Sequence, residues 1–318
     1  LRERAAVDAY RLALADAVRP LADPAAVQAA AAGVLGRHLR ASRVVYVDAE
    51  PTGELVLGRG YTDGVADIPG RYHLDDYGPV LRRELTAGRN IVVPDLPNDP
   101  GYTADEKARY AAVDIAANLS VPLLKDGRLV AILGVHQIEP RPWTAAEVAL
   151  AEETAEATWA AVQRARAEEA LRASEEFRRR SFDQLAAFAG VLDLDGTLIE
   201  ANRAPIEAAG LTRADVIGKP FWECAWWSYA PDVQARLRDA VARARAGETV
   251  RYDEPVMVAD GLMPLDFQLA PLRDETGRVT HLIPSAVDIT ERRRAELALG
   301  DALADTQTLH RLALDMAR

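Results

Sequence analysis

Apolar residues recur at helical and strand spacings in alternating blocks along the first half of the chain. Val7, Tyr10, Leu14 and Val18 recur every three or four positions and predict a helix that ends near Pro20. Similar patterns, together with capping and turn residues, predict the elements that follow. They are helices at 24–39, 79–87 and 103–113, strands at 43–48, 54–61 and 90–94, and an irregular stretch at 68–77.

The strongest turn signal of the chain is Asp126-Gly127. It lies between apolar runs at 119–125 and 129–138 and predicts a β-hairpin. Thr144 with Glu147 then forms a capping box that opens a helix reaching about residue 184. From Thr144 to Gln184 this helix is polar and rich in alanine, with a weak heptad, which predicts an interdomain helix that can pair with a copy of itself.

The order of these elements resembles the GAF fold. The motifs that carry the resemblance are Ser120-Val121-Pro122-Leu123, the turn at 125–128, and Leu133-Gly134-Val135 leading to Trp143 and the helix after it. The resemblance covers roughly residues 7–163. It implies a sensory domain at 1–163, including the N-terminal helix, and a helical linker at 164–181.

A second set of strand and helix patterns begins near Phe182. Strands are predicted at 188–194, 197–201, 249–258, 262–273 and 278–288, with short helices after Asn202 and a longer helix at 231–246. Asn202, the segment 211–219 and the ending Asp288-Ile289-Thr290 resemble PAS domains, which implies a PAS domain at 182–290. The two resemblances together imply an α+β chain. Each of its two domains would have an antiparallel sheet covered by helices, joined and flanked by long signalling helices.

The last predicted strand runs directly into a charged helix, with no Gly or Pro between them. We expect Thr290 to cap this helix, while Glu291 places negative charge at the positive end of the helix dipole. A seam of residues that step by four and three predicts a coiled-coil signalling helix at 291–318. The seam consists of Ala295, Leu299, Ala302, Thr306, Leu309, Ala313 and Met316. The PAS resemblance implies that Asp288, Ile289 and Thr290 relay a signal into this helix, through Leu299 and Leu309.

Composition narrows the class of protein. The 318 residues carry a formal charge of −11, and the basic runs at 178–180 and 292–294 lie beside glutamates, so a nucleic-acid partner is disfavoured. The single cysteine, Cys224, excludes an internal disulfide. No apolar run is long enough for a bilayer. The chain begins on Leu1 inside a predicted helix, so we expect a piece of a longer, soluble, cytoplasmic protein with no membrane partner.

No catalytic or metal-binding constellation is evident, so we expect this region not to be an enzyme. The sequence has no phosphate-binding glycine loop and no Gly-x-Ser-x-Gly motif. Its five histidines lack metal-ligand spacing. His310 lies on a predicted helix, but its neighbours do not match the phospho-accepting motif of sensor kinases. We interpret it as a polar residue beside the helical seam.

Family precedents leave the cofactor unknown. The Asn-Lys, Phe and Asp-Glu motif of cyclic-nucleotide GAF domains is mostly absent. His136, at the end of a late strand, resembles the bilin-contacting histidine of phytochromes, but the first domain has no cysteine for attachment. Cys224 lacks the sequence context of flavin-binding PAS domains, and the helix at 231–246 has no haem-ligating histidine. Flavin and haem are therefore disfavoured, and a bilin remains open only through His136.

An aromatic cluster at 221–229 is the main candidate for a ligand site. Phe221, Trp222, Trp226 and Trp227 could form a box for an apolar or planar ligand, or could simply fill the core. Arg71, Tyr72 and His73 are weaker candidates in the first domain.

The GAF and PAS resemblances imply the input module of a bacterial sensor, a sensor histidine kinase of a two-component system. We expect it to work as a homodimer through its linker and C-terminal helices, and it could bind a small molecule. Two alternatives stay open. The chain could be a ligand-free dimerisation scaffold, or the input module of a cyclic-di-nucleotide cyclase or phosphodiesterase.

Overall fold

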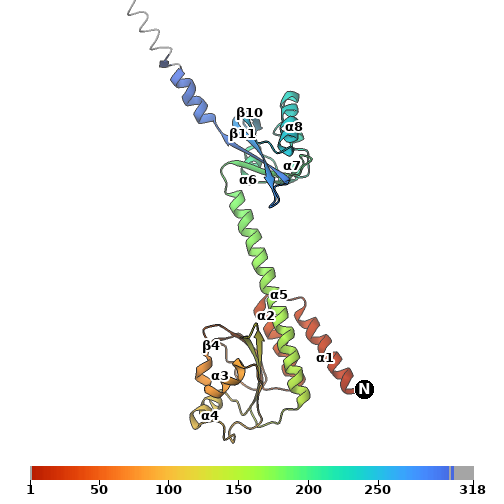
Figure 1. Cartoon of the computed structure of the whole chain (residues 1–318), viewed down its shortest axis with the longest axis vertical. Helices are drawn as coiled ribbons and strands as arrows, with labels where there is room; N and C mark the ends of the chain where they lie inside the picture. The colour runs from red at the N-terminus through yellow and green to blue at the C-terminus, as the bar shows by residue number, and fades with distance from the viewer. Residues whose placement is uncertain (1, 301, 304–318) are drawn as a thin grey trace, which may run out of the picture. The chain divides into compact units, whose positions relative to one another are not determined.

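The computed structural model describes residues 2–300, 302 and 303 (Figure 1). The chain divides between Ser174 and Glu175 into two compact units. Each unit has its own antiparallel sheet and its own apolar core. No helix among the described residues is long and apolar enough to cross a bilayer.

The first unit is a sheet with helices on both faces. Its helices are α1 (Arg2–Val18), α2 (Pro24–Leu39), η1 (Leu74–Tyr77), α3 (Pro79–Thr86), α4 (Ala104–Ala111) and α5 (Ala145–Asp183). Its strands are β1 (Arg43–Ala49), β2 (Glu54–Leu57), β3 (Tyr61–Thr62), β4 (Gly70–His73), β5 (Ile91–Val93), β6 (Ala117–Lys125) and β7 (Arg128–Gln137). The strand order is β4-β2-β1-β7-β6-β5, and β3 pairs with β1.

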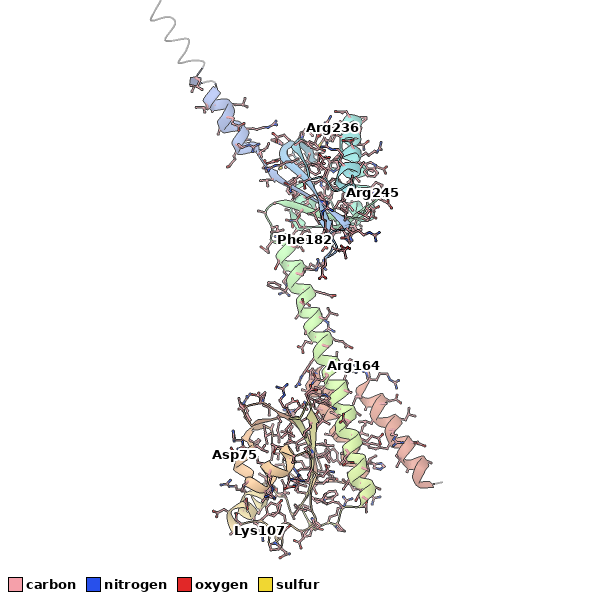
Figure 2. The ribbon with its side chains drawn as sticks, in the orientation of Figure 1. Asp75, Lys107, Arg164, Phe182, Arg236 and Arg245 are labelled. Carbon is pink, nitrogen blue, oxygen red and sulfur yellow. The ribbon has the colours of Figure 1, made fainter. Side chains whose placement is uncertain are left out.

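Both faces of this sheet are buried. On β1, Val44 and Tyr46 belong to the core shared with α1, α2 and α5, whereas Val45 and Val47 face the core that includes residues of α3. Because side chains alternate along a strand, a strand covered on both faces has a continuous apolar run. Arg164 of α5 donates to the carbonyl of Val18 at 3.2 Å and holds α5 beside the end of α1 (Figure 2).

Most predicted elements of this unit are confirmed to within about two residues. Asp126 and Gly127 take positive φ values of 51° and 73°, as a two-residue hairpin turn requires. The predicted irregular stretch at 68–77 is wrong, because β4 pairs there with β2 and η1 follows. The predicted strand at 54–61 is too long, because β2 ends at Leu57 and β3 starts only at Tyr61.

The second unit is a five-stranded sheet with helices over one face. Its strands are β8 (Phe188–Leu192), β9 (Leu198–Ala201), β10 (Val250–Val258), β11 (Gly261–Arg273) and β12 (Val279–Asp288), in the order β10-β11-β12-β8-β9. Its helices are α6 (Arg203–Ala208), α7 (Arg213–Val216), η2 (Phe221–Glu223) and α8 (Pro231–Arg245). The predicted order of strands and helices is confirmed.

Asn202 fixes the start of this sheet. It is fully buried, and its Oδ1 accepts the N–H of Ala189 at 2.9 Å. Its Nδ2 donates to the carbonyls of Leu185 and Ala187 at 3.1 and 2.8 Å. One side chain therefore satisfies three backbone groups that have no partner in the sheet.

Candidate ligand pockets and exit junction

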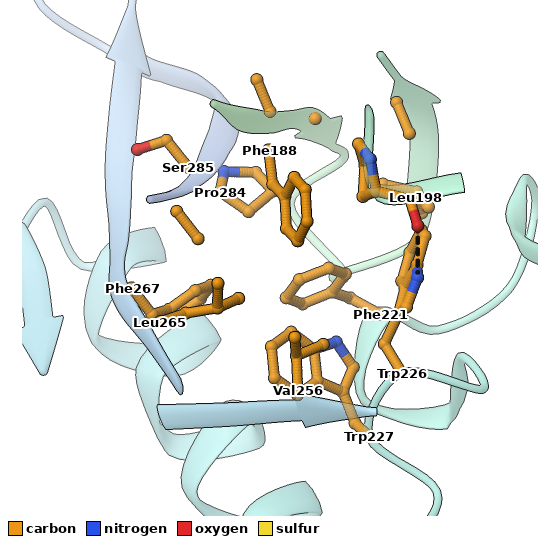
Figure 3. A pocket seen from close by; sticks show the side chains of 15 residues that line it. Phe188, Leu198, Phe221, Trp226, Trp227, Val256, Leu265, Phe267, Pro284 and Ser285 are labelled. Carbon is orange, nitrogen blue, oxygen red and sulfur yellow. Dashed lines mark hydrogen bonds between the residues drawn. The ribbon is translucent and has the colours of Figure 1, made fainter. Parts of the chain in front are cut away.

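A small apolar cavity lies between the sheet of the second unit and the segment that runs from η2 towards α8 (Figure 3). Its volume is about 40 Å³. No charged side chain lines it, and Ser285 provides the single hydroxyl of the lining. The largest lining residues are Phe188, Phe221, Trp226, Trp227, Leu265 and Phe267. The wall therefore matches a small apolar molecule rather than a polar one.

Three aromatic rings set the shape of the cavity. Phe221 stacks on Phe267 with ring centroids 6.2 Å apart, and Trp227 meets both edge-on at 5.5 and 5.9 Å. Trp226 donates from Nε1 to the carbonyl of Pro205 at 3.0 Å, so its ring is fixed. The Nε1 of Trp227 is buried and has no hydrogen-bond partner among the described residues. Together with the hydroxyl of Ser285 it is a polar group in an otherwise apolar wall.

Trp222 is not part of this wall. Its ring lies against the turn at Gly196, where an added Cβ would come within 2.6 Å of it, and Arg238 lies 5.6 Å over its face. The aromatic cluster predicted at 221–229 therefore divides. Phe221, Trp226 and Trp227 meet at the cavity as expected, and Trp222 does not.

Most of the lining residues escaped the sequence analysis, and the two largest of them are Phe188 of β8 and Phe267 of β11, far from the cluster in sequence. Phe267 alternates with the polar residues Asp266 and Gln268, which is typical of a strand with one buried face. Only the sheet topology brings these faces to η2.

A second pocket, of about 80 Å³, lies in the first unit on the sheet face covered by α3 and α4. Most of its wall is aliphatic, with Tyr72 and Tyr110 beside it. Its polar part is a group of three buried side chains from β6 and β7, which are Asn118, Ser120 and His136. Ser120 donates to Oδ1 of Asn118 at 3.1 Å.

His136 lies in the centre of a polar row across three strands. It pairs with Arg43 on β1 and with Asn118 on β6. Burial, and then the charge of Arg43, lower the pKa of His136 to about 3, so its imidazole is neutral at physiological pH. Its Nδ1 is buried and has no hydrogen-bond partner within the part of the chain that the structure describes.

Arg43 is a residue that the sequence analysis missed. It is 1% exposed, and its guanidinium donates to the carbonyls of Ala66 (3.0 and 2.6 Å) and Val113 (2.8 Å). A buried arginine is costly unless its donors are used. Here they hold two loops together beside the pocket. The signal in the sequence was an arginine at the first position of a strand whose next four residues are apolar.

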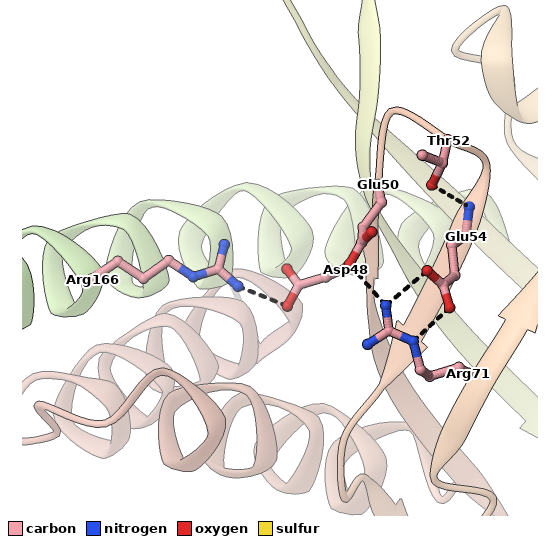
Figure 4. Close-up of polar contacts among 6 residues, drawn as sticks. All are labelled: Asp48, Glu50, Thr52, Glu54, Arg71 and Arg166. Carbon is pink, nitrogen blue, oxygen red and sulfur yellow. Dashed lines mark hydrogen bonds and ion pairs between the residues drawn. The ribbon is translucent and has the colours of Figure 1, made fainter.

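Arg71 and His73 do not reach this pocket. Because side chains alternate along β4, Tyr72 lines the pocket while its two neighbours point the other way. Arg71 is exposed and pairs with Glu54 at 2.5 Å and with Glu50 at 3.2 Å (Figure 4). His73 caps η1 by accepting the N–H of Asp75 at 3.3 Å. Of the candidates in the first unit, Tyr72 and His136 are brought together.

Two family models match the chain. One is described as a GAF domain and matches residues 23–162. The other is described as a PAS fold and matches residues 182–294. The chain is a GAF domain followed by a PAS domain. The polar pocket lies in the GAF domain, and the aromatic cavity lies in the PAS domain.

Two similar relatives are histidine kinases. The sensor histidine kinase TmoS of Ectopseudomonas mendocina is 36% identical over 128 residues, which are 39% of this chain and 13% of that protein. The hybrid signal transduction histidine kinase D of Dictyostelium discoideum is 32% identical over 124 residues, 38% of this chain and 8% of that protein. The chain therefore matches only a small part of either relative. These are sensory domains with homology to sensor histidine kinases.

A solved structure with a similar fold is the chromophore-binding domain of the bacteriophytochrome RpBphP3 from R. palustris. It is 16% identical, the match covers 51% of this chain and 61% of that one, and the TM-score is 0.43.

The exit helix of the PAS domain begins at Thr290 and is described up to residue 300. The prediction that Thr290 caps it is wrong, because the acceptor is Asp288, whose Oδ1 receives the Thr290 N–H at 2.7 Å. Ile289, 4% exposed, donates its N–H to the carbonyl of Pro264 at 3.1 Å and accepts the first helical bond from Arg293 at 2.9 Å. Asp288 and Ile289 thus join β12 to the helix.

Further along the helix, Leu299 is 63% exposed. The seam positions Thr306, Leu309, Ala313 and Met316, and also His310, lie outside the described residues.

A second attachment of the exit helix comes from β10. Asp253 accepts from Arg293 at 3.1 Å, and Arg292 lies 3.7 Å away. The next residue, Glu254, points to the opposite face, where it is 2% exposed and binds Arg236 of α8 through both carboxylate oxygens at 2.9 Å. Successive residues of β10 thus hold the exit helix on one face of the sheet and α8 on the other.

Proposed function

We propose that this chain is the signal-sensing and signal-relaying input module of a bacterial sensor histidine kinase of a two-component system. The observation that carries the proposal is that one strand of the PAS domain, β10, borders both its cavity and its exit helix. Val256 lines the cavity, Met257 donates its N–H to the carbonyl of Trp226 at 3.0 Å, and Asp253 holds Arg293. The similarity of part of the chain to two histidine kinases supports the kinase output.

In the proposed mechanism the exit helix has two conformations, and the ligand shifts the equilibrium between them. A small apolar ligand in the PAS cavity would move Trp226 or Trp227, and with them β10, so that the Asp253 and Asp288 attachments favour a different setting of the exit helix. A ligand can shift such an equilibrium only by its difference in affinity for the two states.

The histidine kinase output is tested on the full-length protein with labelled ATP. We expect label on a histidine, stable to base and lost in acid. A protein that instead converts nucleoside triphosphates to cyclic dinucleotides, or hydrolyses cyclic dinucleotides, would refute the kinase assignment and leave the sensory role intact.

We infer that the chain acts as a homodimer through the linker and C-terminal helices. Every residue of α5 from 166 to 181 is exposed, including Leu171 at 61% and Phe177 at 74%. An unpaired helix of this kind is marginal in water, so a partner helix would stabilise it. Sedimentation should show a dimer that weakens when residues 295–318 are removed or when Phe177 is changed to Glu. Arg179→Glu is the control on the opposite side of the helix. A monomer in every case would contradict the inference.

The ligand-free scaffold remains the second candidate, and one observation favours it. Trp226 and Trp227, each less than 5% exposed, leave only about 40 Å³ of the PAS interior open. An absorption spectrum of protein purified from its native host distinguishes the ligand-free scaffold from a sensor with a bound chromophore. A band beyond the aromatic one would identify a bound chromophore and reject the scaffold.

A further inference from the structure

The floor of the GAF pocket carries hydrogen-bonding groups that the protein itself does not satisfy. His136 is 8% exposed and lines the pocket, yet its Nδ1 has no partner among the described residues. Asn118 is 2% exposed and lines the same pocket, and because its Oδ1 accepts from Ser120, its amide group presents Nδ2 as a donor. Buried polar groups without partners are costly, so their presence in a pocket points to a ligand that completes them.

Gly134 opens these groups to the pocket. It lies between Val45 and Ser120 in the sheet, one row beside the Arg43–His136–Asn118 row. A Cβ at this position would lie 3.0 Å from Nε2 of His136 and 2.9 Å from Cγ2 of Val45. Any larger residue would therefore fill the space in front of the imidazole.

The charges around the pocket select an uncharged ligand. No carboxylate, ammonium or guanidinium group lines it. The guanidinium of Arg43 lies beside it, but its donors are already bound to the carbonyls of Ala66 and Val113. An ionised ligand would lose its hydration without gaining a partner of opposite charge. The neutral imidazole of His136 offers one donor and one acceptor, and the Asn118 amide adds a further donor.

The size of the pocket limits the ligand to a few heavy atoms. Its volume of about 80 Å³ is roughly half that of a cavity that holds benzene, and several times the space that one water needs. Aliphatic side chains such as Val45, Val47 and Ile132 form the rest of the wall. One end of the ligand must therefore be apolar, and the other must both donate and accept hydrogen bonds.

We propose that the GAF pocket binds a short aliphatic primary amide, with its amide group against His136 and Asn118 and its alkyl end against Val45 and Ile132. This inference rests on the proposed sensory role, since it names the ligand chemistry of the GAF half of the sensor. The PAS cavity has no comparable polar group apart from the Nε1 of Trp227 and the hydroxyl of Ser285, so the two domains would respond to different molecules.

The test is a titration of the whole chain with propionamide, followed by calorimetry and by the imidazole ¹⁵N signals of His136, which His136→Gln assigns. We expect saturable binding that shifts these signals, with at least tenfold weaker binding of propionate, which has the same shape but carries a charge. Gly134→Ala should abolish binding. Asn118→Ala, which removes the amide donor without filling the pocket, should weaken binding about fivefold, the effect of one neutral hydrogen bond. Ser228→Ala, an exposed serine of the PAS domain, should change nothing.

Three results would overturn the proposal. They are equal or tighter binding of propionate, propionamide binding that survives Gly134→Ala in a folded protein, and no binding at the limit of solubility, which would mean that water alone occupies the pocket. A different result would refute the proposed sensory function without refuting the binding site. If propionamide binds as described but the amide exchange of residues 289–300 never changes, the site stands and the sensory role falls.

Discussion

Truncating Phe221 tests whether the PAS cavity is a ligand site. Phe221 is 5% exposed, stacks on Phe267 and meets Trp227 edge-on, so Phe221→Ala removes one phenyl ring next to the existing space of about 40 Å³. Truncations of this kind cost about 3–5 kcal/mol. The enlarged cavity keeps its apolar wall, and benzene has the shape of the group removed.

Benzene that binds in the enlarged cavity should restore part of the lost stability, because a ligand that binds only the folded state stabilises it. Benzene at about 100 times its dissociation constant should return about 2.7 kcal/mol. For a domain of this size that corresponds to roughly 10 °C in the thermal midpoint. The assay is thermal unfolding of the whole chain with and without benzene, followed by tryptophan fluorescence.

The control is a variant that is destabilised without a new cavity. Gly196 has a φ of 83°, and a Cβ there would meet the ring of Trp222 at 2.6 Å, so Gly196→Ala strains the PAS domain but adds no space. Benzene should leave its midpoint unchanged. A folded Phe221→Ala protein that also ignores benzene would refute the view of this cavity as a site for apolar ligands.

Three further predictions concern single side chains. Asp253→Asn should speed amide exchange in the exit helix at 290–300 while the PAS core keeps its protection, because the substitution removes the charged partner of Arg293. Equal exchange in the variant and the wild type would mean that β10 does not take part in relaying the signal. The free energy of unfolding of the GAF domain should fall as the pH drops from about 6.5 towards about 3, by at most about 1.4 kcal/mol per pH unit. The reason is that burial lowers the pKa of His136 to about 3 in the folded domain, whereas the unfolded chain takes up this proton near pH 6.5. Urea titrations at several pH values measure this slope, and His136→Gln should flatten it. Burial raises the pKa of the Cys224 thiol to about 11, so thiol reagents should label it only after unfolding; rapid labelling of the native protein would contradict its burial.

Local signals explain why the fold could be predicted well. Asp126-Gly127 marks a hairpin through positive φ values at both residues, and Asp195-Gly196 marks another through the positive φ of Gly196. Capping boxes at Thr103 and Thr144 mark the starts of helices through hydrogen bonds that span three residues. Where the local signal is weak, as in Gly70-Arg71-Tyr72-His73, the strand was missed, because its pairing with β2 is what makes it a strand.

The sites could be predicted only in part, because they depend on contacts between distant residues. Phe221, Trp226 and Trp227 stood out as an aromatic cluster, but the direction of Trp222 depends on how η2 packs against Gly196. Asn118 gave no signal of its own, and the only signal of Arg43 was its position at the start of an apolar strand. They become functional candidates only because the strand register places them on either side of His136.

The cap of the exit helix was also predicted wrongly, although the residues that compete for it are neighbours in the sequence. The chain from Asp288 to Thr290 offers two side chains that can cap a helix, and the sequence pattern favours the threonine. The buried Ile289 decides between them, because its N–H is tied to Pro264 and its carbonyl accepts the first helical bond. The helix therefore starts at Thr290, one residue earlier than a threonine cap would place it, and Asp288 supplies the acceptor for the Thr290 N–H.

The central claim is that occupancy of the PAS cavity reaches the exit helix. It is tested most directly by amide hydrogen exchange of the wild-type chain with and without dissolved xenon, a probe that enters apolar cavities. Binding is followed in parallel by the ¹²⁹Xe signal. The account predicts that xenon changes the exchange of the amides from Ile289 to Arg293, and that Asp253→Asn reduces this change. Xenon bound in the cavity with unchanged exchange at these amides would contradict it.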